Sequence, residues 1–403
     1  MTSPILERLR ALLGPAQVAR DPGGLPRATP DSSETMATVC RLAHEEGWRV
    51  RVEGCGTWLQ TDAPADLAIS TRALDQISSL APADLVATVQ AGTTVDTLRR
   101  RLADQRMWLA LDPPGRPERS IGSVVATATA GPLRNGSGPV RDHVLGCTVV
   151  TGDGRIVRAG GRVVKNVAGY DITKLQVGGF GAFGILTEVH LRLRAVPRAD
   201  QTITARGGRD TLTSVARDLV ADGFAPAALE LMSPAAAAGA DWILAVRLLG
   251  PDEAVEADAR RLATAGGLVW EPVPAERSHA FWNLCARAAL GGPVTFRLGV
   301  LTAGLDDTID MVAHDLDEGI ITAGAGQAGM LRWTGDASPE RLRHLRRVLA
   351  AREIPMTIER APWGVRQAVG HFGAYREGVG TLVGRLRETF DPGHRLQVAL
   401  EAG

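Results

Sequence analysis

KNVAGYDITKLQVGGFGAFGI, residues 165–185, is the stretch that carries the most information about the fold. Four glycines between positions 178 and 184 lead into Ile185–Leu193, whose alternation of apolar and polar residues predicts a half-buried strand. The stretch also holds Lys165 and Lys174, the only lysines among the 45 basic side chains. Because ammonium and guanidinium groups differ in shape and hydration, this clustering indicates a local requirement that arginine does not meet. Chance clustering is the alternative.

Two further glycine-containing segments precede this stretch. Glu53–Thr57 (EGCGT) follows a predicted strand, and Ser120–Gly131 (SIGSVVATATAG) reads as a helix of small residues that could pack very close to another backbone or a ligand. Glycine at such positions lets several backbone N–H groups approach one ligand, as binding of a pyrophosphate requires. The segments match neither the GxGxxG dinucleotide fingerprint nor a P-loop. Any one of them alone could also be a plain turn.

Length and composition set the outer limits. A chain of 403 residues with 45% hydrophobic and 22% charged residues predicts a globular protein of two domains. The formal net charge of zero gives no reason to expect nucleic acid or an anionic membrane as a partner. No apolar run is long enough for a membrane span, and residues 5–13 read as an amphipathic helix rather than a signal peptide. A cytoplasmic location is therefore expected.

Cysteine and histidine spacing argues against a metal centre. The cysteines are scattered and form no CxxC pair, so we expect no disulfide framework, structural zinc or iron–sulfur cluster in this chain. The C-terminal half contains several histidines but no HxH, HxxH or HxxxH pair, so no metal site is expected there either. These residues are Cys40, Cys55, Cys147, Cys285, His279, His314, His344, His371 and His394.

Periodicity predicts two regions, divided near Pro197. The first combines helices over 33–46, 93–105 and 120–131 with strands over 48–52, 85–92, 144–150, 155–158 and 185–193. Within it, Gly152-Asp-Gly154 predicts a hairpin. The second region alternates helices with short strands and predicts an antiparallel sheet with a loose two-fold repeat. Its helices are expected near 210–222, 252–265, 276–290, 304–315 and 338–350, and its strands near 227–232, 242–249, 294–300, 329–333 and 354–358.

In order and spacing, the glycine segments resemble the flavin domain of the vanillyl-alcohol oxidase / p-cresol methylhydroxylase (PCMH) superfamily, over roughly residues 20–197 and at Phe390-Asp391-Pro392. Within that superfamily, Lys165–Leu175 resembles the KNVAGYD signature of the FAD-binding subunits of bacterial glycolate oxidase, and Gly138–Gly146 is similar to the same subunits. The resemblance implies an α+β chain. A two-lobed PCMH-type FAD-binding domain (1–197, lobes 1–75 and 76–197) would precede an α+β substrate or cap domain with an antiparallel sheet (198–375). A C-terminal helix and tail (376–403) would return to the FAD domain.

The resemblance also implies which residues hold FAD, without a covalent bond. The first loop would offer backbone amides to the pyrophosphate, and the second loop, with Pro113 before it, would face the flavin. The third would lie along the adenosine or isoalloxazine end, and Asp142 and Lys165 would add polar contacts. The candidate set is Gly54, Cys55, Gly56, Thr57, Pro113, Ser120, Ile121, Gly122, Ser123, Asp142, Lys165, Gly181, Gly184 and Ile185.

Three departures from the family pattern matter. Glu53 would repel a pyrophosphate unless strand alternation turns it away. The third loop reads GGFGAFG where related 2-hydroxyacid dehydrogenases have a Ser-Glu-Gly core. No histidine lies between 45 and 142, which excludes a histidyl flavin link from the first loop and leaves Cys55 as the formal candidate for a cysteinyl link.

The histidine-rich substrate motif of those dehydrogenases is also missing, and the catalytic residues are unknown. His371 and Arg366 are the remaining candidates, with Trp363 beside them as a pocket wall. The alternatives are that His371 lies in a surface loop, that Arg366 is a surface charge and that Trp363 has a packing role. His344 lies among arginines on a predicted helix and reads as part of a solvated basic face.

The resemblance implies an FAD-dependent oxidoreductase acting on CH–OH groups. The chain would be a subunit of a glycolate oxidase complex that oxidises glycolate, a 2-hydroxy acid, to glyoxylate. Its partners would be a sister FAD-containing subunit and an iron–sulfur subunit, and the complex would be cytoplasmic or peripheral to the inner membrane. One alternative is a self-sufficient FAD-dependent dehydrogenase for another hydroxy acid or alcohol. Another is a scaffold subunit without catalysis.

Overall fold

The computed structural model describes residues 4–162, 171–316, 319–326, 329–373 and 375–400. The N-terminal part forms a four-stranded sheet beside two helices, α1 (Pro4–Leu13) and α2 (Ser33–Glu45). Its strand order is β1 (Val18–Arg20), β2 (Pro26–Ala28), β4 (Leu67–Ser70), β3 (Val50–Glu53), with β4 parallel to both β2 and β3. The hydroxyl of Ser32 accepts the N–H of Thr35 and caps α2, which confirms the predicted helix start.

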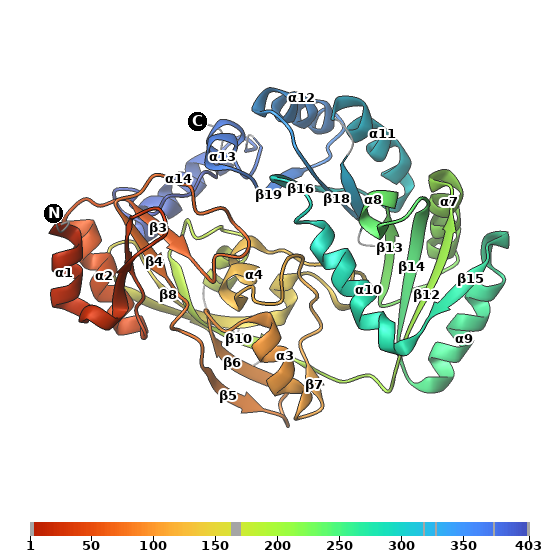
Figure 1. Cartoon of the computed structure of the whole chain (residues 1–403), viewed down its shortest axis with the longest axis horizontal. Helices are drawn as coiled ribbons and strands as arrows, with labels where there is room; N and C mark the ends of the chain where they lie inside the picture. Colours follow the sequence, from red (N-terminus) through yellow and green to blue (C-terminus); the bar gives the residue numbers. More distant parts are fainter. Residues whose placement is uncertain (1–3, 163–170, 317–318, 327–328, 374, 401–403) are drawn as a thin grey trace.

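A five-stranded antiparallel sheet follows (Figure 1). Its order is β5 (Ile77–Ala81), β6 (Val86–Gln90), β10 (Ile185–Arg192), β8 (Val144–Val150), β9 (Ile156–Gly160). The helices α3 (Val95–Ala103) and α4 (Ile121–Thr127) pack on it through one apolar cluster. The predicted hairpin at residues 152–154 is confirmed as the β8–β9 turn, where Gly154 has φ +83°.

The helix α4 is shorter than the sequence predicted. It ends at Thr127 because Ala128 adopts the left-handed conformation with φ 48°. The expected close approach to another backbone is confirmed at Gly122, where an added Cβ would lie 2.9 Å from the carbonyl oxygen of Ala91. This approach holds α4 against the residue that follows β6.

The C-terminal half is built on one eight-stranded antiparallel sheet, as the sequence predicted. The order is β15 (Trp270–Val273), β12 (Ala199–Gly207), β14 (Trp242–Gly250), β13 (Ala228–Met232), β17 (Ile320–Gly324), β18 (Met330–Gly335), β16 (Val294–Gly299), β19 (Met356–Arg360). Along the chain, two β-α-β-β-α-β units follow one another and meet at the β13–β17 pair. The predicted two-fold repeat is therefore confirmed.

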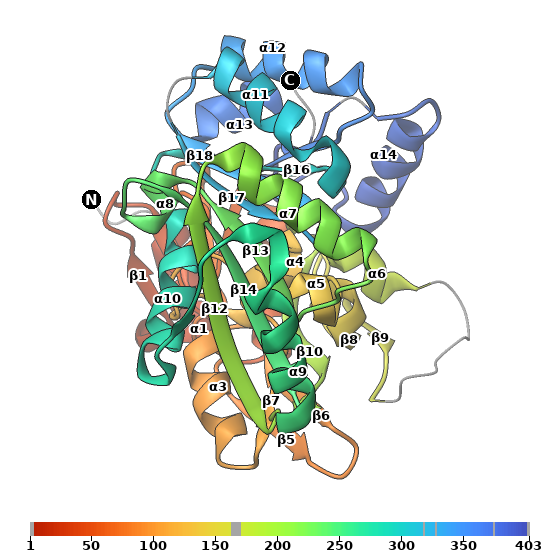
Figure 2. The same ribbon diagram turned by 90° about the vertical axis from the view of Figure 1, so that its right-hand side faces the viewer.

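Helices cover the two faces of this sheet unequally. The largest apolar cluster joins one face to α7 (Arg209–Ala221), α9 (Asp252–Ala263), α11 (Leu305–Asp315) and α12 (Pro339–Ala350). Figure 2 shows α7 and α9 lying across the outer side of the strands. The opposite face packs on α8 (Pro234–Ala237) and α10 (Ala275–Ala288) through a smaller cluster. Side chains of β16 and β18 reach the N-terminal half from the same sheet.

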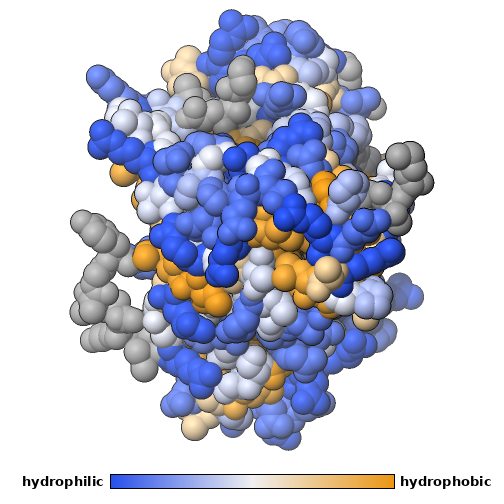
Figure 3. Space-filling model, turned by 90° about the vertical axis from the view of Figure 1, so that its left-hand side faces the viewer, coloured by the Kyte–Doolittle hydropathy of each residue, from blue (hydrophilic) through white to orange (hydrophobic). Residues whose placement is uncertain are grey.

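Between β11 (Arg194–Ala195), which pairs with β7 (Met107–Trp108), and β12, the chain passes to the eight-stranded sheet. We propose the domain boundary there. After α13 (Trp363–Val369) and α14 (Val379–Phe390), the tail pairs with the first sheet, where Val50 N–H donates to Arg395 O and Gln397 N–H to Val50 O. The face at the left of Figure 1 is mainly hydrophilic with separate apolar patches (Figure 3). In the described part of the chain, no helix is both long and apolar enough to cross a bilayer.

Candidate functional site

The three glycine-containing loops predicted from the sequence meet around one pocket. The first loop follows β3, α4 forms a second wall, and the third loop precedes β10; the C-terminal tail closes the pocket. Its lining includes Glu53, Gly54, Cys55, Gly56, Thr57, Trp58, Gly122, Ser123, Ala126, Thr127, Gln176, Phe180, Gly181, Gly184, Ile185, Arg366, His371 and Gln397. We call this the loop pocket.

The glycines of the loop pocket fall into two groups. Gly54 and Gly184 allow close packing, because an added Cβ would lie 2.3 Å from Ser120 Oγ and 2.5 Å from Val149 Cγ1, respectively. Gly56 and Gly181 have φ near +69° and +82°, and an added Cβ at either would have no atom closer than 4.0 Å. Both glycines therefore adopt a left-handed conformation with open space beside them. Such positions let backbone N–H groups approach a ligand.

A buried donor in the same wall also fits a ligand. Trp58 is 3% exposed and lines the loop pocket, yet its indole Nε1–H has no acceptor among the described residues. An unpaired buried donor costs free energy, so an acceptor atom on a bound molecule would relieve it. The open backbone turns and this donor together fit a cofactor that carries phosphate and carbonyl oxygens.

Glu53 does not place an unpaired negative charge in the loop pocket. Its carboxylate accepts from Arg51 Nη2 at 2.7 Å and lies 3.3 Å from Arg27 Nη2. Arg51 is shared with Asp21, at 2.5 Å. Two guanidinium groups against two carboxylates make this corner electrically neutral, which removes the repulsion that the sequence led us to expect.

The thiol of Cys55 is not activated for covalent attachment of a flavin. Sγ lies 3.7 Å from the carbonyl oxygen of Gly92, and burial raises the pKa of the thiol. A raised pKa disfavours the thiolate that covalent attachment of a flavin would require.

Of the candidate catalytic residues, both line the loop pocket, and both are held by other groups. His371 is 1% exposed, its ring stacks on Phe180 at 3.9 Å, and its Nδ1–H donates to Ile358 O at 2.7 Å. Burial lowers the pKa of His371 to about 3, so the imidazole is neutral and Nε2 is an acceptor. Arg366 donates to Asp62 Oδ1 at 2.7 Å and to Ala361 O at 2.8 Å.

Several predicted cofactor residues lie outside the lining. Ser120 is fully buried and caps α4 by accepting the N–H of Ser123. Pro113 and Ile121 line a small hollow on the opposite side of α4. Asp142 is exposed beside Arg141, 3.6 Å away. Lys165 lies outside the described residues. The other predicted loop positions are brought together at the loop pocket.

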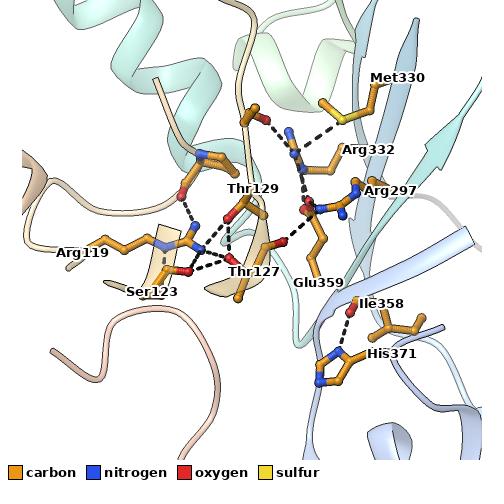
Figure 4. Close-up of polar contacts among 12 residues, drawn as sticks. Arg119, Ser123, Thr127, Thr129, Arg297, Met330, Arg332, Ile358, Glu359 and His371 are labelled. Atoms are coloured by element: carbon orange, nitrogen blue, oxygen red, sulfur yellow. Dashed lines mark hydrogen bonds and ion pairs between the residues drawn. The ribbon is translucent and has the colours of Figure 1, made fainter. Parts of the chain in front are cut away.

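Three ionic groups, of which Glu359 and Arg332 are buried and Arg297 is partly buried, join the eight-stranded sheet to the end of α4 (Figure 4). Glu359, with no exposed side-chain area, accepts from Arg297 Nη1 at 2.8 Å and from Arg332 Nε at 2.7 Å. The two arginines also donate to Thr127 O and Ala130 O, at 3.3 and 3.0 Å. Although burial alone would raise it, Arg332 and Arg297 lower the pKa of Glu359 to about 2. We call these three side chains the junction triad.

Arg119 lies next to this junction and was not identified from the sequence. It is 1% exposed and its guanidinium carbon lies 4.1 Å from the centre of the Trp58 ring. A single arginine or tryptophan gives no sign in the sequence that it belongs to a binding site. The one available signal was the position of Arg119 directly before the small-residue helix. The described residues contain no group of three or more histidine, cysteine or acidic side chains that could hold a metal.

Comparison with known proteins agrees with this geometry. Residues 27–160 match the family described as "FAD binding domain". The glycolate oxidase subunit GlcE of Escherichia coli (strain K12) is 42% identical over 123 residues, which cover 30% of this chain and 35% of that protein. The glycolate oxidase subunit GlcD of Bacillus subtilis (strain 168) is 27% identical over 249 residues, covering 58% and 53%.

A probable mitochondrial D-lactate dehydrogenase of Danio rerio is 32% identical over 176 residues, which cover 42% of this chain and 35% of that protein. The chain thus spans between a third and about half of the length of these relatives. Among solved structures, an alkyldihydroxyacetonephosphate synthase superposes with a TM-score of 0.73 at 14% identity, covering 98% of this chain and 86% of that one, which shows a shared fold. The chain therefore contains an FAD-binding domain and is related to FAD-linked oxidoreductases that act on hydroxy acids.

Proposed function

We propose that this chain is the FAD-carrying subunit of a glycolate oxidase complex. The complex oxidises glycolate to glyoxylate and passes the electrons through flavin to an iron–sulfur subunit. A sister FAD-containing subunit is the second partner. The observation that carries the proposal is the loop pocket, whose open backbone turns at Gly56 and Gly181 lie within one cavity with the unpaired Nε1–H of Trp58.

The fit to FAD rests on this chain's own residues. The first loop and Ser123 present backbone and hydroxyl donors, and Arg51 and Arg27 neutralise the buried Glu53 in the lining. Phe180 and the aliphatic wall around Ile185 exclude water from the interior. Bound FAD supplies the hydride-accepting and electron-transfer chemistry that oxidation of a CH–OH group requires, and no protein side chain supplies it.

We further propose that the substrate is oxidised mainly on the sister subunit. A 2-hydroxy acid needs a cation for its carboxylate and a base for its hydroxyl proton. Arg297 and Arg332 share Glu359, and Arg366 binds Asp62, so each of these three guanidinium groups is already held by a carboxylate. The best catalytic pKa lies near the working pH, whereas that of His371 is about 3. These features favour a flavin that relays electrons.

One observation keeps a second candidate, a self-sufficient dehydrogenase for a hydroxy acid or alcohol. His371 lines the loop pocket, and its Nε2 has no hydrogen-bond partner among the described residues. A substrate hydroxyl could donate to this nitrogen. The neutralisation of Glu53 weakens the third candidate, a scaffold without flavin, because the charge that would have prevented FAD binding is compensated.

A visible spectrum of the purified chain, followed anaerobically as glycolate is added, separates these functions. The proposal predicts flavin bands that persist with glycolate, bleach with dithionite, and bleach with glycolate once the sister subunit is added. Bands that bleach with glycolate alone would contradict the relay and favour the self-sufficient enzyme. A chain that takes up no FAD would contradict the proposal as a whole.

A further inference from the structure

Arg119 is a buried cation whose hydrogen bonds to the described residues all go to neutral oxygens. Nη1 donates to Pro114 O at 2.8 Å and Nε to Ser123 Oγ at 3.2 Å. Nη2 donates to Thr127 Oγ1 at 2.7 Å and to Thr129 Oγ1 at 2.5 Å. These contacts orient the guanidinium group fully, as Figure 4 shows. Burying a charge without an opposite charge costs free energy, so the position of Arg119 calls for a reason.

The neighbouring charges do not compensate Arg119. Glu359 is already shared by Arg297 and Arg332. Burial raises the pKa of Glu230, a second carboxyl near Arg332, to about 8, so this group is mostly neutral at pH 7. Three guanidinium groups against one carboxylate leave two positive charges over. Burial lowers the pKa of Arg119 to about 9, which still leaves the side chain protonated at neutral pH.

Arg119 also fixes two donors in the wall of the loop pocket. Ser123 Oγ accepts from Arg119, so the hydroxyl proton of Ser123 remains available to donate. The Trp58 ring lies against the guanidinium group at 4.1 Å, and its Nε1–H is the unpaired donor described above. Ser123 and Trp58 both line the loop pocket. A buried cation and two donors without acceptors therefore converge on one part of the pocket.

We propose that Arg119 is a positioning residue that, through Ser123 and Trp58, stabilises negative charge on FAD bound in the loop pocket. This inference rests on the proposed function, because it requires FAD in that pocket. Two parts of FAD carry such charge, the pyrophosphate and the reduced isoalloxazine ring. Binding of the pyrophosphate would contribute equally to both oxidation states, whereas binding of the reduced ring would raise the reduction potential.

The test compares Arg119→Met, Arg119→Lys and Ser123→Ala with the unaltered chain. Affinity is measured by quenching of FAD fluorescence, and the reduction potential by anaerobic reduction against a reference dye. We expect Arg119→Met to weaken FAD binding about tenfold. This is the size of losing one or two hydrogen bonds to a charged group, here those that Ser123 and Trp58 would donate to FAD. Arg119→Lys keeps the charge and should restore part of the affinity. Ser123 is only partly buried, so Ser123→Ala tests the same contact if Arg119→Met does not fold.

Arg360→Met is the matched control, because this partly buried arginine donates to Gly292 O and does not line the loop pocket. If the reduced form loses about tenfold more affinity than the oxidised form, the potential falls by about 30 mV and the ring is the charged group. Equal loss in both forms assigns the pyrophosphate. Unchanged affinity and potential in Arg119→Met and Ser123→Ala, with FAD bound by the unaltered chain, would overturn this inference alone. Failure of the unaltered chain to bind FAD would overturn the proposed function as well.

Discussion

Replacing Glu359 by glutamine removes the anion of the junction triad and leaves Arg332 as a buried cation and Arg297 as a partly buried one. The pKa of Glu359 lies at about 2 instead of 4.5. At 1.36 kcal/mol per pKa unit, this difference corresponds to about 3 kcal/mol in favour of the ionised form in the folded chain. Removal of one partner of a buried ion pair typically costs about 3–5 kcal/mol. We therefore expect Glu359→Gln to lower the free energy of unfolding by about 3 kcal/mol.

Urea unfolding followed by tryptophan fluorescence measures this change, since Trp333 on β18 stacks on Phe296 in the same sheet. Glu256→Gln is the control, because its partner Arg260 is 3.6 Å away and both side chains are largely exposed; no measurable change is expected. The pH dependence gives an independent check. Because folding lowers the pKa of Glu359, its contribution is complete above pH 4.5 and is lost as the pH falls toward 2.

Glu359→Gln should lack that acid-sensitive contribution. A loss of less than about 1 kcal/mol at neutral pH, the size of a surface ion pair, would refute the reasoning that the triad is a buried and tightly coupled ionic group. An equal loss in Glu359→Gln and Glu256→Gln would do the same.

Three further predictions concern the loop pocket. Gly54→Ala would place a Cβ 2.3 Å from Ser120 Oγ and should weaken FAD binding at least about tenfold in a fluorescence titration. The control Gly250→Ala, where the added Cβ meets no atom within 4 Å, should leave the FAD affinity unchanged. Burial lowers the pKa of His371 to about 3, so its imidazole NMR signals should not titrate between pH 5 and pH 8. Acid precipitation should release all FAD from the unaltered chain and from Cys55→Ser alike, because the Cys55 thiol is not activated.

Opposite outcomes have distinct meanings. Unchanged FAD affinity in Gly54→Ala would show that the first loop does not hold the cofactor. A His371 titration near pH 6.5 would remove the main argument against this residue as a base. The lowered pKa of His371 also implies a contribution to folding stability that is present above pH 6.5 and is lost as the pH falls toward 3. A titration near pH 6.5 would show that this contribution is absent. Flavin that stays with the precipitated unaltered chain but not with Cys55→Ser would demonstrate a cysteinyl link.

Much of the fold could be predicted from the sequence because local signals agreed with it. The helix predicted over 33–46 is found as α2, and the apolar spacing located the four helices on the outer face of the large sheet. Strands β12, β15 and β17 were missed, since polar or mixed segments such as ADQTITARG become strands through pairing with distant neighbours. The end of α4 was missed because Ala128 has a left-handed conformation without a glycine to signal it.

The site was predictable to the extent that it depends on glycine. Gly54, Gly56 and Gly181 were identified because few other residues suit close backbone approach or a positive φ. The roles of Arg119 and Glu359 could not be seen, since a charged side chain gives no sign in the sequence of being fully buried. Glu53 was read as an obstacle although Arg51 lies two residues before it on the same strand; its second partner, Arg27, becomes a neighbour only when β2, β3 and β4 pair.

The most direct test of the central claim is a titration of the purified chain, freed of cofactor, with FAD. The account predicts saturation at about one FAD per chain, with quenched tryptophan or flavin fluorescence and a flavin absorption spectrum that differs from that of free FAD. Absence of saturable binding by a correctly folded chain would contradict the assignment of the loop pocket as the FAD site.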